Sequence, residues 1–180
     1  HAVHHGEHSL LVHCSDGWDR TAQICVLSQL LLDPHYRTIR GFATLFDKDV
    51  VAFGHKCRER LGFTSGGVLG REWSPIALQL LDAVHQIMLQ CPDAYEFDTS
   101  AWRFIATHLY SGYVGNFRFD SERMRVEHGG DATSLWVVLM QKRGSFRNRK
   151  YTPWPVNQGP LQPSSSLQQL QVWDLFLQPP

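Results

Sequence analysis

Residues 13–21 read His13-Cys14-Ser15-Asp16-Gly17-Trp18-Asp19-Arg20-Thr21 and lie between two apolar segments. The run at 9–13 is short and apolar, as is typical of a buried strand, and Gly17 favours a turn after it. From about Trp18 to Leu32 apolar residues recur at helical spacing, and Asp33-Pro34 ends the predicted helix. The order strand, loop, helix predicts an α/β fold in which the loop carries Cys14.

The loop has the residues that an attack on a phosphate group needs. Cysteine attacks as its thiolate, which requires a lowered pKa and neutralisation of the incoming negative charge. Backbone N–H groups from Cys14 to Arg20 can converge on phosphate oxygens, and the start of the following helix adds positive potential. The planar guanidinium of Arg20 can bind two phosphoryl oxygens at once, which a lysine cannot do. The pattern therefore indicates a nucleophilic cysteine in a phosphate-binding loop.

Hydrolysis through a phosphocysteine also needs a proton for the leaving group and a base for water. Asp19, next to Arg20 at the helix start, is our candidate for both roles, and Asp16 is assigned to substrate contact. The reverse assignment of the two aspartates stays open. Thr21 can donate a hydrogen bond to the cysteine sulfur.

Composition narrows the class of protein. The 180 residues contain 17 Lys and Arg and 17 Asp and Glu, so no overall charge favours nucleic acid. The four cysteines form no C-x-x-C pair, which argues against a zinc site and favours a reducing compartment. No apolar run reaches the length needed to span a bilayer. We expect one cytoplasmic globular unit, beginning inside a longer protein, with no metal and no cofactor.

The rest of the chain is predicted to be mainly helical. Ser74-Pro75 is typical of a helix start, and an apolar stripe continues from it toward Cys91. A second helix is predicted from Thr99 to about Ser111, and a final amphipathic helix within 161–178. The glycine-rich segment Gly62–Gly70 is predicted to be a loop.

The signature at 13–21 resembles that of the myotubularin-related lipid phosphatases. A tryptophan after the glycine and two aspartates distinguish this signature from that of the protein tyrosine phosphatases. Further blocks resemble the family in the same order along nearly the whole chain, among them Tyr36–Phe42, Phe53–Lys56, His108–Ser111 and Leu170–Trp173. The resemblance implies a protein-tyrosine-phosphatase-like α/β fold, of which residues 1–180 form the C-terminal half of the phosphatase domain.

The resemblance also implies an activity: metal-free removal of the 3-phosphate from phosphatidylinositol 3-phosphate and phosphatidylinositol 3,5-bisphosphate. It makes Cys14, Asp19 and Arg20 catalytic. The implied partners are phosphoinositide lipids at a membrane surface and related phosphatases in homo- or hetero-oligomers, with a peripheral, endosomal location. Lys56 and Arg60, four residues apart, lie where family members meet the second phosphate. The remaining implied substrate-binding residues are Ser15, Asp16, Gly17, Trp18 and Thr21.

Some positions depart from the family pattern. Asp49-Val50-Val51 replaces an expected acidic–tryptophan pair, Phe63 replaces a histidine, and the loop Thr64–Glu72 is poor in histidine and aspartate. These departures concern fine substrate preference more than the chemistry of the loop. Three functions stay open. They are an active lipid phosphatase, an inert fragment or pseudophosphatase that binds lipid or an active relative, and a protein tyrosine phosphatase.

Overall fold

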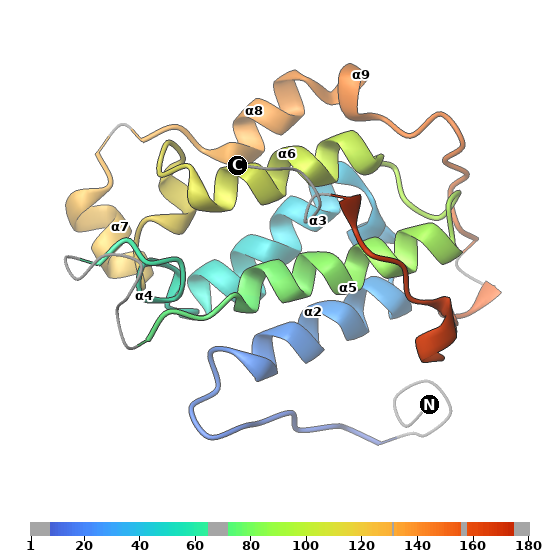
Figure 1. The fold of residues 1–180 in the computed structure, drawn as a ribbon, viewed down its shortest axis with the longest axis horizontal. Helices are drawn as coiled ribbons and strands as arrows, with labels where there is room; N and C mark the ends of the chain where they lie inside the picture. The colour runs from blue at the N-terminus through green and yellow to red at the C-terminus, as the bar shows by residue number, and fades with distance from the viewer. Residues whose placement is uncertain (1–7, 65–71, 131, 156–157, 175–180) are drawn as a thin grey trace.

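The computed structural model describes residues 8–64, 72–130, 132–155 and 158–174, and these residues are mostly helical (Figure 1). Short 3-10 turns form at η1 (Pro34–Arg37), η4 (Gly115–Phe117) and η6 (Leu167–Gln169), and a π-helix, η2 (Asp47–Ala52), continues α3. The α-helices are α2 (Arg20–Leu32), α3 (Ile39–Phe46), α4 (Cys57–Arg60), α5 (Ile76–Gln90), α6 (Thr99–Tyr110), α7 (Glu122–His128), α8 (Leu135–Gln141) and α9 (Arg143–Phe146).

The strand predicted at 9–13 is not formed. Across the described ranges the β-type pairing is a single bridge between Phe97 and Arg147. Leu10 and Leu11 are 62% and 85% exposed, and the segment runs along the outside of α2 (Figure 1). A strand needs a neighbouring strand for its backbone hydrogen bonds, and the described part of the chain offers it none. The expected strand at 9–13 is therefore wrong, whereas the mainly helical character of these residues is confirmed. The α/β architecture of the whole domain stays a prediction.

Helix α2 begins at Arg20 and ends at Leu32, close to the predicted limits. Its core residues are Ala22, Val26 and Leu30, whereas the apolar Ile24 is half exposed. Apolar residues are distributed around the whole helix, between polar ones, so the spacing of apolar residues could not identify its buried face. The helix packs on α5 and on η2, and the side-chain amide of Gln23 in its first turns donates to the carbonyl of Ile76 at the start of α5, at 2.9 Å.

Helix α3 lies at the centre of the aromatic core. Phe42 contacts the rings of Phe97, Trp102 and Trp136 at centroid distances of 5.5, 4.8 and 6.2 Å. Trp102 of α6 is fully buried and its indole N–H donates to the carbonyl of Leu81 in α5, at 2.7 Å. These contacts join α3 to α6 and α8, and Trp102 joins α6 to α5.

The predicted helix starts at 74–75 and 99 are confirmed to within two residues, but the final amphipathic helix is not formed. The described part of 161–178 contains no α-helix; η6 is a three-residue 3-10 turn, and Leu167 and Leu170 are exposed. The main-chain N–H and carbonyl of Gln171 instead pair with the side-chain amide of Gln86 in α5, and Trp173 stacks on His85. This segment lies extended across α5 because that helix provides partners for its backbone. Most of the predicted loop 62–70 lies outside the described residues.

Candidate active site

The loop between Cys14 and α2 places two hydrogen-bond donors on the cysteine sulfur. The backbone N–H of Gly17 lies 3.2 Å from Cys14 Sγ, and the hydroxyl of Thr21 lies 3.3 Å from it. Gly17 has a φ of 90°, which favours glycine because other residues are strained there. The loop thus turns back on itself and brings its own N–H groups, and the first turn of α2, to the sulfur.

These contacts change the chemistry of Cys14. The hydrogen bond from Thr21, followed by backbone donors of Gly17 and Asp16, lowers the pKa of the thiol to about 7. By contrast, burial raises the pKa of Cys25, Cys57 and Cys91. Near neutral pH about half of Cys14 is therefore thiolate. Of these thiols, Cys14 alone is prepared to act as a nucleophile.

Arg20 lies exposed at the first position of α2, beside the loop. Its guanidinium donates to Ser15 Oγ at 3.2 Å, and that hydroxyl in turn lies 3.2 Å from a carboxylate oxygen of Asp16. None of the described carboxylates forms an ion pair with Arg20. Its charge is therefore available to an anion that enters the loop.

Asp19 precedes α2 but makes no side-chain cap on it, although aspartate is among the favoured capping residues. Its carboxylate turns instead to two groups outside the loop. His55 Nδ1 lies 3.0 Å from Oδ1, and the Arg60 guanidinium reaches Oδ2 with Nη2 at 2.8 Å and Nε at 3.1 Å. Burial alone would raise the pKa of Asp19, but these hydrogen bonds and charges outweigh it and lower the pKa to about 2.

Lys56 and Arg60 both approach the loop from α4 and the residue before it, as their spacing suggested. The Lys56 ammonium lies 4.6 Å from the ring centre of Trp18, and it pairs with Glu59 at 3.3 Å. Arg60 is mostly buried and bridges Asp19 to Glu72, whose carboxylate lies 3.1 Å away. Arg60 is thus already engaged, and its contact with a second phosphate stays a prediction.

Sequence reasoning missed one residue of this site, His55. It is 1% exposed, and Nδ1 lies 3.0 Å from both the Trp18 carbonyl and Asp19 Oδ1. His13, the histidine inside the signature, is by contrast exposed. The sequence signal that could have identified His55 was its place in the family-like block Phe53–Lys56. The segment around that block has no clear periodicity, so it did not indicate where the side chain of His55 would lie.

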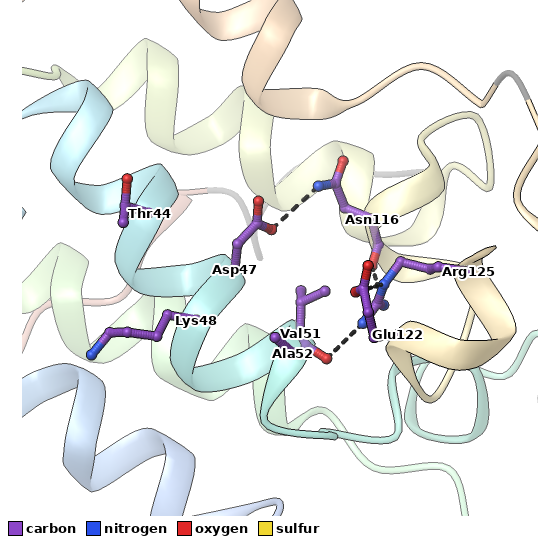
Figure 2. A pocket seen from close by; sticks show the side chains of 8 residues that line it. All are labelled: Thr44, Asp47, Lys48, Val51, Ala52, Asn116, Glu122 and Arg125. Carbon is purple, nitrogen blue, oxygen red and sulfur yellow. Dashed lines mark hydrogen bonds and ion pairs between the residues drawn. The ribbon is translucent and has the colours of Figure 1, made fainter.

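A separate cavity of about 610 Å³ lies between η2 and α7 (Figure 2). Arg125 donates to the carbonyl of Val51 and pairs with Glu122, while Asn116 donates to Asp47. No loop residue lines this cavity. In the part of the chain that the structure describes, no group of three metal-ligating side chains occurs, and no helix is long and apolar enough to cross a membrane.

Comparison with known proteins gives one consistent result. Residues 1–126 match the family described as the myotubularin-like phosphatase domain. The chain is 45% identical over 142 residues to the phosphatidylinositol-3-phosphate phosphatase MTMR7 of Homo sapiens, covering 78% of this chain and 21% of that protein. It is 39% identical over 173 residues to the phosphatidylinositol-3,5-bisphosphate 3-phosphatase MTMR2 of Gallus gallus, covering 95% and 30%. The chain therefore spans less than a third of either relative.

Proposed function

Because the chain belongs to the myotubularin-like phosphatase family, we propose that the protein containing it removes the 3-phosphate from phosphatidylinositol 3-phosphate and phosphatidylinositol 3,5-bisphosphate. The observation that carries the proposal is the pair of donors on Cys14 Sγ, from Gly17 and Thr21 at the start of α2. The names of the relatives support the choice of lipid substrates.

In the first step the Cys14 thiolate attacks phosphorus, and the bond from phosphorus to the inositol oxygen breaks. The leaving oxygen takes its electron pair and a proton, and phosphocysteine remains. Loop N–H groups and Arg20 hold the phosphoryl oxygens, where charge develops. In the second step water attacks phosphorus, loses a proton to a base, and releases inorganic phosphate and the thiolate. Thr21 stabilises that thiolate as it leaves.

Asp19 is the proposed acid and base. The ionised carboxylate of the free protein suits the second step, in which it accepts a proton from water. In the first step Asp19 must carry a proton. A bound phosphate dianion brings negative charge next to this carboxylate and so raises its pKa, which favours proton uptake together with substrate. Asp16, exposed beside Ser15, is the proposed substrate contact.

The fold, location and assembly of the whole protein belong to the same proposal. We place these helices in a protein-tyrosine-phosphatase-like α/β domain, with Lys56 and Arg60 facing the lipid headgroup together with Ser15 and Trp18. The protein is proposed to act in the cytoplasm, at the surface of endosomal membranes, alone or in oligomers with related phosphatases.

Phosphate release from the two lipids in vesicles tests the proposal, with the full-length protein and its Cys14→Ser variant. We expect turnover by the wild type and none by the variant. Lipid binding without any turnover would establish a scaffold instead, and preference for phosphotyrosine peptides would establish a protein tyrosine phosphatase. Asp19→Asn should lose more turnover than Asp16→Asn, and the opposite order would reverse their assignment.

A further inference from the structure

His55 makes an unusual pair of contacts for a buried histidine. Its Nδ1 lies 3.0 Å from the carbonyl oxygen of Trp18 and 3.0 Å from Oδ1 of Asp19. Both neighbours are hydrogen-bond acceptors, since one is a carbonyl oxygen and the other belongs to an ionised carboxylate. Nδ1 therefore carries the hydrogen. Nε2 is buried and has no partner among the described residues. The polar contacts of this ring are therefore made at Nδ1, and both of them go to the loop.

His55 and Arg60 divide the carboxylate of Asp19 between them. His55 Nδ1 lies 3.0 Å from Oδ1, to which Arg60 Nε also donates at 3.3 Å, while the shorter contacts of Arg60, at 2.8 and 3.1 Å, go to Oδ2. Arg60 is itself held on its other side by the main-chain carbonyl and the carboxylate of Glu72. A carboxylate fixed at both oxygens cannot rotate about its Cβ–Cγ bond. Because Nδ1 also contacts the Trp18 carbonyl, His55 fixes the orientation of the Asp19 carboxylate relative to the loop backbone.

We propose that His55 is a positioning residue that aims the Asp19 carboxylate toward the leaving oxygen and the attacking water. The inference rests on the proposed function, in which Asp19 transfers both protons. A proton-transferring group must lie within hydrogen-bond reach of the reacting atom, and small displacements are costly. The charged group in contact with this pair is Arg60, with Glu72 behind it; Lys56 lies over the ring of the neighbouring Trp18 and pairs with Glu59.

Two substitutions separate positioning from packing. His55→Ala removes the Nδ1 donor. In His55→Asn the side-chain amide nitrogen takes the place of Nδ1, so a hydrogen-bond donor is retained at that position. In the full-length protein we expect His55→Ala to lower kcat on phosphatidylinositol 3-phosphate about 10- to 100-fold with little change in KM, and His55→Asn to stay within about threefold. The acidic limb of the pH profile of kcat should shift in His55→Ala and stay in place in His55→Asn. His128→Ala, on the exposed surface of α7, serves as the control.

The leaving group provides a second test. An activated aryl phosphate departs without a proton, so formation of phosphocysteine from it should change less than about threefold in His55→Ala. Full lipid turnover by His55→Ala would overturn the proposal. Equal losses in His55→Ala and His55→Asn, with an unchanged pH profile in both, would also overturn it and leave His55 a packing residue.

A thermal double-mutant cycle distinguishes failure of the positioning proposal from failure of the proposed function. If the wild type releases no phosphate from either lipid, the proposed function fails, but coupling between His55 and Asp19 can still be measured. His55→Ala and Asp19→Ala together should lower Tm by less than the sum of their separate effects, whereas His128→Ala and Asp19→Ala should be additive. Additivity of the first pair would overturn the role of His55 whatever the activity.

Discussion

Replacing Thr21 by valine should raise the pKa of Cys14. The hydroxyl of Thr21 donates to the sulfur at 3.3 Å and is the largest of the contributions that lower this pKa to about 7. Thr21 is only 6% exposed, and valine keeps the shape of its side chain while removing the donor. The backbone donors to the sulfur remain in this variant, so the thiol should stay more acidic than an ordinary cysteine.

The size of the change can be bounded. If the pKa returned fully to the ordinary value of about 8.5, the thiolate fraction at pH 7 would fall from about one half to about one thirtieth, or about sixteenfold. If Thr21 supplies half of the lowering, the fraction falls about threefold. We therefore expect a midpoint between about 7.5 and 8.5 for Thr21→Val, and a midpoint near 7 for Thr21→Ser, which keeps the hydroxyl.

Alkylation by iodoacetamide as a function of pH measures this midpoint, with mass spectrometry of the peptide that contains Cys14. The midpoint is more informative than a single rate, because a more basic thiolate is intrinsically more nucleophilic and compensates in part. The raised pKa values of Cys25, Cys57 and Cys91 keep those thiols largely unreactive in this range. An unchanged midpoint in Thr21→Val, or an equal rise in Thr21→Ser, would refute this account of thiol activation.

Three further predictions concern the loop and its supports. Asp19 has a pKa of about 2, below its ordinary value of about 3.9, so it contributes stability that is complete above about pH 5 and lost progressively as the pH falls to about 1. Allowing for solvent screening, Asp19→Asn should reduce the free energy of unfolding by about 1–2 kcal/mol at pH 7, and the difference should shrink at acidic pH; a constant difference would contradict this. Gly17→Ala should strain the turn by about 1–2 kcal/mol and raise the alkylation midpoint of Cys14, and an unchanged midpoint would show that the φ of 90° is not needed. Glu96→Gln, which weakens a buried contact to the first N–H of α3 and to a guanidinium, should cost about 2 kcal/mol in denaturant unfolding, against less than about 0.5 for the exposed Glu127→Gln; equal losses would contradict the reasoning.

The predicted loop depended on local sequence, and its geometry agrees with that prediction. The loop is short enough that the spacing of Cys14, Gly17 and Thr21 in the sequence brings both donors to the sulfur. The roles of these residues in catalysis stay predictions. The helix starts at 74–75 and 99 were also local signals, carried by the Ser74-Pro75 pair and by apolar spacing.

What could not be predicted depended on contacts between distant segments. His55 reaches Trp18 across 37 positions, and Arg60 reaches Asp19 across 41, which no local pattern encodes. The segment around Gln171 has helical spacing, yet it lies extended because Gln86 of α5 provides hydrogen bonds to its backbone. The expected strand before Cys14 failed for the complementary reason, since a strand depends on a partner that the described residues do not provide.

The π-helix η2 has a consequence for the number of residues that this region can contain. The wider turn between Asp47 and Ala52 accommodates one residue more than an α-helical turn, and the bond from the His55 N–H to the Val50 carbonyl, at 2.9 Å, spans the same interval of five. Deleting one residue here would favour regular α-helix and turn everything beyond it by about 100°. The imidazole would then swing away from the Trp18 carbonyl even though every side chain of the loop was intact. The site therefore depends on chain length in η2 as well as on residue identity, and aligned relatives with a shorter η2 would need a different residue to hold the aspartate.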